Sequence, residues 1–183
     1  MHRPSDYPST LLWLLDETHV TVTAATALAI LWTQSAHCAY FAAGALGSTV
    51  VTRIIKRAIQ QPRPPPPPPS TKPAPVRPKR TYGMPSTHST ALGFYFAYMW
   101  PLLPLISSTM WGERAAVTTI TVLTLWSRVE LGYHTVPQVV VGTTVGVICA
   151  AAWKVLWESN PAIEMQLQSL MDTVRDRALS LFF

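Results

Sequence analysis

The stretch SRVELGYHTVPQVVVGTTVGVICAAAWKVLW, residues 127–157, joins a short polar island to a long apolar run. The island contains Arg128 and His134, whereas Lys154 is the one charged residue between positions 136 and 157. A helix that spans a membrane needs ~20 predominantly apolar residues. The stretch therefore predicts a membrane helix that begins directly after two side chains suited to binding or transferring phosphate.

Two further polar islands border apolar runs in the same way. They are KRAIQQPRP at residues 56–64, with Lys56 and Arg63, and PSTH at residues 85–88, with His88. Cationic side chains neutralise a phosphoryl group, and two imidazoles can serve as nucleophile and proton donor. The three islands together predict a phosphate-handling site.

The composition favours a membrane protein. Hydrophobic residues make up 49% of the 183 residues and charged residues only 13%, compared with roughly 25% charged in a soluble domain. Mean hydropathy is +0.22. Five apolar segments predict an all-α integral membrane helical bundle with about five transmembrane helices, at residues 18–34, 36–55, 86–106, 115–131 and 136–157. A soluble helical bundle is the alternative, but the runs contain few charges.

The chain divides into three parts. We expect an N-terminal segment at 1–17, a membrane-embedded domain at 18–160, and an amphipathic C-terminal helix at 161–183 that lies on the membrane surface. A proline-rich loop at 62–80 interrupts the membrane domain. Its proline run favours an extended, solvated spacer, and docking of an SH3-like partner is the alternative.

Counting the spans places all three islands on one membrane face. Net charge is +5, and many of the basic residues fall in one stretch: Arg53, Lys56, Arg57, Arg63, Lys72, Arg77, Lys79 and Arg80. Such a patch can bind nucleic acid, acidic headgroups or a phosphorylated substrate. Its position beside apolar spans, without a nucleic-acid motif, favours a lipid phosphate in the bilayer and excludes nucleic acid as the expected partner.

The spacing of these residues resembles the three signature motifs of the type 2 phosphatidic acid phosphatase superfamily. The residues are Lys56 and Arg63-Pro64, the run Pro85-Ser86-Thr87-His88, and Ser127-Arg128 with His134. The longer context YGMPSTH at 82–88, with Tyr133-His134-Thr135 and Gln138, looks most like the dolichyl diphosphatase branch. The resemblance covers residues 56–142, so it leaves the first span and the tail without a signature.

The resemblance implies a role for each matching residue. Lys56, Arg63 and Arg128 would hold the phosphoryl oxygens, since the planar guanidinium groups can bond bidentately. Ser86 and Thr87 would add hydroxyls and backbone N–H groups at a helix start. His134 would be the nucleophile that forms a phosphohistidine, and His88 would protonate the departing oxygen and then activate water. The family needs no metal or other cofactor.

One position departs from the wider superfamily, which has an aspartate four residues after the nucleophilic histidine. Here that residue is Gln138, whose carbonyl can accept the ring N–H but brings no charge. The substitution indicates either an inactive site or a leaving group good enough to manage without the carboxylate. A polyprenyl phosphate is such a leaving group. Glu130 is an alternative carboxylate near the site.

The sequence therefore predicts a metal-independent lipid diphosphate phosphatase, most like one that hydrolyses dolichyl (polyprenyl) diphosphate in support of N-glycosylation. The resemblance implies a multi-pass protein of the endoplasmic reticulum membrane with a lumenal active site, although the basic residues alone would favour the cytoplasmic face. The alternatives are a broader lipid phosphate phosphatase, acting on phosphatidic acid or short isoprenyl diphosphates, and an inactive scaffold that presents the proline-rich loop.

Overall fold

The computed structural model describes residues 3–65, 81–102 and 108–180, and these residues form an all-α fold. The α helices are α1 (Thr10–Asp16), α2 (Thr18–Thr33), α3 (Ala36–Ile59), α4 (Thr87–Met99), α5 (Ser108–Glu130), α6 (Val136–Ser159) and α7 (Pro161–Leu179). Short 3-10 helices lie at Pro4–Asp6 and Trp100–Leu102. The predicted fold class is confirmed, and α2 to α6 correspond to the five apolar segments.

Not every helix of the bundle meets the requirements for a membrane span. Within the described residues, α3 and α6 are long and apolar enough to cross a membrane, and α1 with α2 makes a third candidate, bent by 48°. With 13 residues, α4 is shorter than the ~17 residues that a span needs. Two to three of the about five predicted spans thus pass this test of length and composition within the described residues. The polar residues along α5 lower its mean hydropathy.

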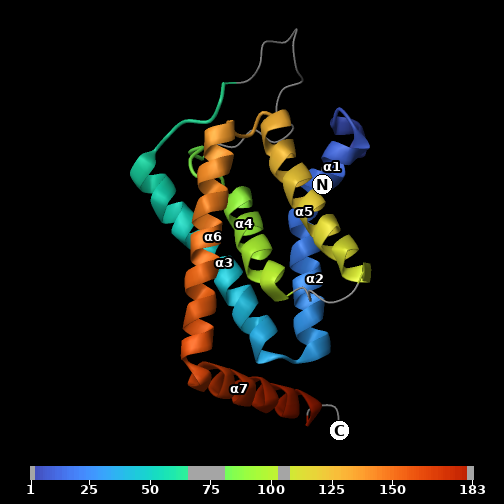
Figure 1. Ribbon diagram of the computed structural model, residues 1–183, viewed down its shortest axis with the longest axis vertical. Helices are drawn as coiled ribbons and strands as arrows, with labels where there is room; N and C mark the ends of the chain where they lie inside the picture. The colour runs from blue at the N-terminus through green and yellow to red at the C-terminus, as the bar shows by residue number, and fades with distance from the viewer. Residues whose placement is uncertain (1–2, 66–80, 103–107, 181–183) are drawn as a thin grey trace.

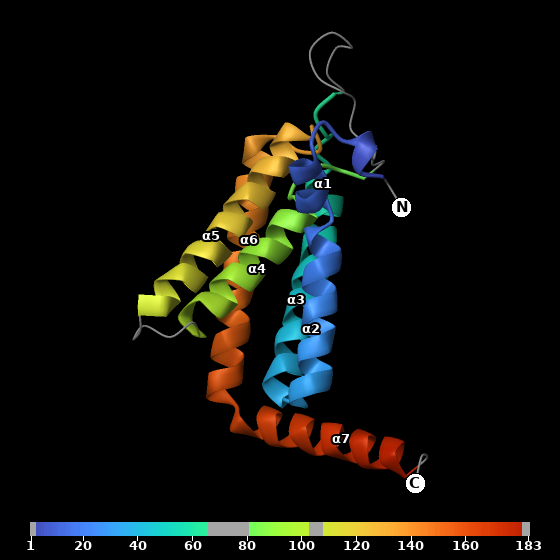
Figure 2. The same ribbon diagram turned by 90° about the vertical axis from the view of Figure 1, so that its right-hand side faces the viewer.

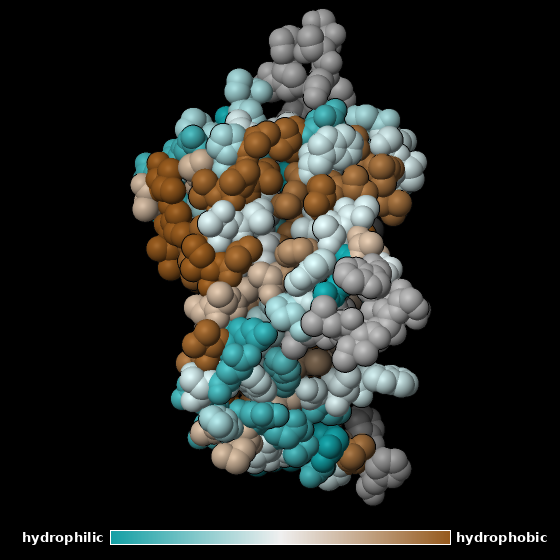
Figure 3. Space-filling model, in the orientation of Figure 1, coloured by the Kyte–Doolittle hydropathy of each residue, from teal (hydrophilic) through white to brown (hydrophobic). Residues whose placement is uncertain are grey.

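The helices α2 to α6 form the bundle, and α7 crosses one end of it (Figures 1 and 2). The C-terminal ends of α3 and α5 and the N-terminal ends of α4 and α6 lie at the opposite end, where the polar islands meet. Apolar side chains face outward along the long helices, among them Val50 and Ile54 of α3 and Val140 and Ile148 of α6. Figure 3 shows such side chains over much of the upper half of one face.

Glycines allow α4 and α6 to pack closely. A Cβ on Gly146 would meet the carbonyl oxygen of Thr90, and one on Gly93 would meet that of Thr143. A Cβ on Gly142 would lie 2.6 Å from the carbonyl oxygen of Ser86. Each obstacle is backbone, which cannot move aside as a flexible side chain can. The close approach of these two helices therefore depends on the absence of side chains at the glycines.

Aromatic side chains fill the space between α3, α4 and α6. Phe94 and Tyr98 of α4 are fully buried against Ala45 of α3 and Ala150 of α6. Trp153 donates its indole N–H to the carbonyl oxygen of Tyr40 (3.0 Å), and this ring stacks on the Tyr40 ring. Such packing fixes α3 against the α4–α6 pair.

The helix α7 follows α6 after Asn160 and is attached to the turn between α2 and α3. Gln168 donates to the carbonyl oxygen of Gln34 (3.0 Å) and accepts from the N–H of Ala36 (2.9 Å). The predicted C-terminal helix is thus present over residues 161–179, and its placement on a membrane surface stays a prediction. The greater part of the proline-rich loop, and with it the expected SH3-like docking, falls on residues 66–80, outside the described residues.

We expect Gly146→Ala to destabilise the protein by about 1–3 kcal/mol, the usual cost of over-packing, because the added methyl group meets the Thr90 carbonyl. Gly47→Ala is the matched control, since no atom lies within 4 Å of a Cβ at Gly47. The control should stabilise α3 by about 0.5–1 kcal/mol. Thermal unfolding in detergent measures both, and equal midpoints for the two variants would contradict the packing described.

Candidate active site

The three polar islands come together at one end of the bundle (Figure 1). The first begins in the last turn of α3, the second contains the start of α4, and the third connects α5 to α6. Two hydrogen bonds join them: the N–H of Ser86 donates to the carbonyl of Gln138 (3.0 Å), and Arg63 Nη1 donates to the carbonyl of Tyr133 (2.7 Å). The convergence deduced from counting spans is therefore present in the structure.

His134 is held by Gln138, one turn further along. His134 Nδ1 lies 3.2 Å from Gln138 Oε1. An amide oxygen only accepts, so Nδ1 carries the proton. On the other side of the ring, Nε2 lies 3.1 Å from Arg63 Nη1. A guanidinium only donates, so Nε2 presents its lone pair. The partners of the ring thus select the tautomer in which Nε2 is available as a nucleophile.

The amide of Gln138 has one orientation that satisfies all its neighbours. Its Nε2 donates to the carbonyl of Pro62 (2.9 Å) and to Gln61 Oε1 (3.1 Å), while its Oε1 also accepts from the N–H of Thr135 (3.3 Å). A flipped amide would place its oxygen against the Pro62 carbonyl. A Cβ on Gly83 would overlap this amide, so a side chain there would displace Gln138 from its present position. Gln138 is therefore held in the orientation that pairs its oxygen with His134.

Arg63 is positioned by both sides of the loop. Its Nε donates to the carbonyl of Thr81 (2.9 Å) and its Nη2 to the Thr81 hydroxyl (3.1 Å), in addition to the bonds to Tyr133 and His134. Burial lowers the pKa of the Arg63 guanidinium, and the influence of Tyr133 partly offsets this. A bound phosphate would compensate for the lost hydration of this cation.

Lys56 occupies the last turn of α3, where the chain turns at Gln60 in a left-handed conformation (φ 53°). The residue is 7% exposed, and its Nζ donates to the carbonyl of Tyr82 (2.8 Å). The N–H of Gly83 donates to the carbonyl of Gln61 (2.7 Å). Lys56 therefore binds the residue that precedes Gly83, and Gly83 packs against the Gln138 amide. These contacts keep the charge of Lys56 close to the site.

Ser86 and Thr87 begin α4. Ser86 is fully buried and caps the helix, since its hydroxyl accepts from the N–H of Ser89 (3.3 Å) and from the Ser89 hydroxyl (2.8 Å). Thr87 is half-buried and is the first residue of the helix. Backbone N–H groups in the first turn of a helix favour an anion. The Ser86 hydroxyl has a structural role as the helix cap, so the predicted anion site would use the first-turn N–H groups.

The arrangement of a tautomer-fixed histidine, two cations and a helix N-terminus suits transfer of a phosphoryl group. A family model described as the PAP2 superfamily matches residues 36–161. The chain belongs to the PAP2 superfamily. The predicted resemblance is thereby confirmed, and the matched residues run from the start of α3 to the start of α7.

Named relatives support the same family. The chain is 31% identical over 128 residues to a dolichyldiphosphatase of Saccharomyces cerevisiae, covering 66% of this chain and 52% of the relative. It is 30% identical over 166 residues to dolichyldiphosphatase 1 of Homo sapiens, covering 82% and 67%. The chain thus spans about half to two thirds of the length of these two relatives.

A solved structure has the same fold. It is that of a transmembrane PAP2-type phosphatidylglycerolphosphate phosphatase from Bacillus subtilis, with a TM-score of 0.57 and 21% identity, covering 84% of this chain and 72% of the other. At this identity the likeness shows the fold alone. The PAP2 chain is therefore an all-helical membrane protein of a phosphatase family.

His88, the predicted proton donor, faces a second histidine that the sequence did not single out. The rings of His88 and of His19, in the first turn of α2, meet edge to face with centroids 5.5 Å apart. Both line a small cavity of about 90 Å³ between α2 and α4. The structure therefore places the His88 ring beside His19 of α2.

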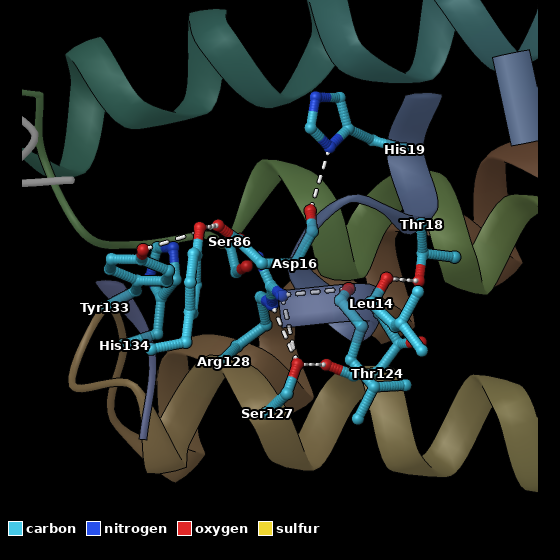
Figure 4. A network of polar contacts seen from close by, with 12 residues as sticks. Leu14, Asp16, Thr18, His19, Ser86, Thr124, Ser127, Arg128, Tyr133 and His134 are labelled. Atoms are coloured by element: carbon cyan, nitrogen blue, oxygen red, sulfur yellow. Dashed lines mark hydrogen bonds and ion pairs between the residues drawn. The ribbon is translucent and has the colours of Figure 1, made fainter. Parts of the chain in front are cut away.

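Arg128 is directed towards the N-terminal segment (Figure 4). Its guanidinium is 0% exposed and forms an ion pair with Asp16 at the end of α1, 3% exposed (2.5 Å). It also donates to the carbonyl of Leu15 (3.1 Å) and to the Ser127 hydroxyl (3.0 Å). Its predicted role in binding phosphate stays a prediction, and its contacts include Asp16 and Leu15 of α1 and Ser127 of α5.

Asp16 is a site residue that sequence reasoning missed. Its second carboxylate oxygen accepts from the Tyr7 hydroxyl (2.6 Å). The available signal was a carboxylate directly after the apolar patch at 11–15, because a charge among apolar residues is often buried with a partner. The first seventeen residues, which matched no motif, therefore supply the counter-charge to a signature arginine of this PAP2 protein.

Replacing Asp16 by Asn should destabilise the protein by about 3–5 kcal/mol, because removing one partner leaves the Arg128 charge buried without compensation. Asp176→Asn is the control, since this carboxylate of α7 is 68% exposed in its pair with Arg175. Thermal unfolding in detergent measures both variants. A shift for Asp16→Asn no larger than for the control would show that the buried pair contributes little.

Proposed function

We propose that the protein hydrolyses a lipid diphosphate, most specifically dolichyl (polyprenyl) diphosphate, to the monophosphate and inorganic phosphate. The observation that carries the proposal is the His134–Gln138 pair, in which a neutral amide fixes the tautomer of a nucleophilic imidazole. Relatives named dolichyldiphosphatase at 30–31% identity support the substrate class.

In the first step, the Nε2 lone pair of His134 attacks the terminal phosphorus. The N–P bond forms as the bond from phosphorus to the bridging oxygen breaks, and His88 gives a proton to that oxygen of the departing polyprenyl phosphate. Lys56, Arg63 and Arg128, with the Thr87 N–H in the first turn of α4, would stabilise the charge on the phosphoryl oxygens. For Arg128 this requires contacts beyond those it makes with Asp16.

In the second step, water attacks the phosphorus of the phosphohistidine. His88, now neutral, takes a proton from this water, and the N–P bond breaks to release inorganic phosphate and restore His134. Only protons and a phosphoryl group move. The reaction as proposed uses side chains of this chain and water alone, in line with a metal-independent phosphatase.

The neutral Gln138 supports a diphosphate substrate over a phosphate monoester. A carboxylate at this position would stabilise the imidazolium character that develops as Nε2 attacks, whereas an amide only orients the ring. Attack on a phosphate monoester expels an alkoxide, which is a poor leaving group, so this reaction needs the additional stabilisation that a carboxylate would give. A polyprenyl phosphate is a far better leaving group, so orientation of the ring and a proton from His88 suffice.

The cellular setting follows from the substrate. A dolichyl diphosphatase recycles the glycan carrier of N-glycosylation in the endoplasmic reticulum membrane, and we propose that location with the active site on the lumenal side. Basic residues at the site have a phosphate-binding role, so we do not assign sidedness from them. Tagging the ends of the chain for protease protection in microsomes tests the orientation.

His134→Ala should abolish phosphate release from dolichyl diphosphate in detergent, because the nucleophile is lost. Asp176→Asn, in the exposed ion pair of α7, is the control and should keep most of the activity. An active His134→Ala would overturn the mechanism, and an inactive wild type would favour the scaffold. A higher kcat/KM for phosphatidic acid than for dolichyl diphosphate would favour the broader lipid phosphate phosphatase.

Gln138→Leu should lower kcat about 100-fold, since residues that orient a catalytic ring commonly contribute this much. KM should change less, because Gln138 does not contact the lipid in this mechanism. Val140→Leu, at an exposed position of the same helix, serves as the control. Initial rates over a range of substrate concentrations separate kcat from KM, and a loss confined to KM would contradict the orienting role.

A further inference from the structure

A large apolar cavity lies between α2, α3 and α4. It has a volume of about 460 Å³, and its walls include Val22, Ala25 and Ala29 of α2, Phe41 of α3, and Tyr95 and Met99 of α4. We call it the tail slot. Its polar groups are paired with one another: the Thr26 and Tyr95 hydroxyls lie 3.0 Å apart, and His37 Nε2 lies 2.9 Å from the Tyr98 hydroxyl. The slot therefore offers an occupant an almost wholly apolar surface.

The tail slot adjoins the small cavity that contains His88. Val22 and Tyr95 line both cavities, so the two meet at these side chains. On α4, His88, Leu92, Tyr95 and Met99 follow at spacings of three and four residues, which places them on one face of the helix. A continuous surface thus runs from His88 down the face of α4 that is turned to α2.

The shape of the bundle leaves room for this surface. α4 packs most closely against α6, on its other side, whereas α2 packs against α3. Figure 2 shows α4 inclined away from α2 and α3 along its length. Because Ala25 and Ala29 have small side chains, α2 fills little of the space between the helices. The separation of the two helices is thus built into the packing of the fold.

We propose that the tail slot binds the part of the isoprenoid chain next to the diphosphate of the substrate. The inference rests on the proposed function. In that reaction the chain leaves with the bridging oxygen, which His88 protonates, while the terminal phosphoryl group goes to His134. His134 is not among the residues that line either cavity, whereas His88 lines the smaller one. The slot therefore extends from the leaving-group side of the reaction.

The dimensions limit how much chain the slot holds. Val22 to Ala29 spans seven residues of α2, or about 10 Å at ~1.5 Å per residue. The slot then holds only the isoprene units nearest the diphosphate headgroup. The rest of a long polyprenyl chain extends into the surrounding lipid. Binding in an apolar pocket of this kind would add affinity for each buried methylene group.

The test compares two substrates in one pair of variants. Ala25→Phe fills the slot, whereas Ala24→Phe adds the same side chain at a neighbouring position that does not line it. We expect Ala25→Phe to lower the ratio of kcat/KM for dolichyl diphosphate to that for isopentenyl diphosphate by about tenfold or more. Ala24→Phe should keep the wild-type ratio. Equal losses for both substrates, or an unchanged ratio in Ala25→Phe, would overturn the proposal.

Cys38 provides a second measurement that does not depend on turnover. It lines the tail slot, and the sequence has Cys149 as its one other cysteine. In a Cys149→Ser variant, dolichyl phosphate should slow alkylation of Cys38 by N-ethylmaleimide several-fold, and inorganic phosphate should not. An unchanged rate, or equal slowing by a phosphatidylcholine without the isoprenoid chain, would overturn the assignment of the slot.

These outcomes are separable from failure of the proposed function. If the wild type hydrolyses neither diphosphate, the proposed reaction fails, while the alkylation experiment still reports whether the isoprenoid lipid occupies the slot. If the wild type is active and the ratio does not change in Ala25→Phe, the reaction stands and the slot fails.

Discussion

The close packing of α4 on α6 is the constraint on which the site depends. With Gly93, Gly142 and Gly146 at the contact, the two backbones approach until the N–H of Ser86 reaches the carbonyl of Gln138. That single bond aligns the start of α4 with the start of α6, and so brings the second island to the third. The same packing leaves α2 apart from α4, which opens the cavities beside His88.

Charge balance is the second requirement of this end of the bundle. Lys56, Arg63 and Arg128 belong to the islands at this end of the bundle, and each donates to a backbone oxygen. Arg128 forms an ion pair with Asp16, and both side chains are buried. The bent α1–α2 pair therefore has an electrostatic role, since it delivers the carboxylate that compensates the most buried of these cations.

Much of the fold could be predicted from the sequence. Apolar runs identified the helices α2 to α6, because helix length and hydrophobicity are local properties of the sequence. The residues of the three polar islands and their spacing identified the family. Among the described residues, α3, α6 and the bent α1–α2 pair pass the length and hydropathy test for a span, whereas α4 is short and polar residues occur along α5. The contact between His134 and Gln138 was foreseen from the family resemblance, in which the residue four positions after the histidine orients its ring.

Contacts between distant segments could not be predicted. Asp16 and Arg128 are separated by 112 positions, and His19 meets His88 only through the crossing of α2 and α4. No periodicity in one segment specifies such partners. The tail slot is likewise a property of the spaces between helices, since alanines at 25 and 29 look like any other small residues in an apolar run.

The central claim, that the three islands form one phosphohistidine site at His134, has a direct test. Purified protein is mixed briefly with dolichyl diphosphate labelled in its terminal phosphate, quenched in alkali to preserve phosphohistidine, and analysed by peptide mapping. We predict label on the peptide that contains His134, and its loss in His134→Ala. Hydrolysis of the substrate with label on another residue, or with His134 unlabelled under conditions that trap the intermediate in His88→Ala, would contradict the account.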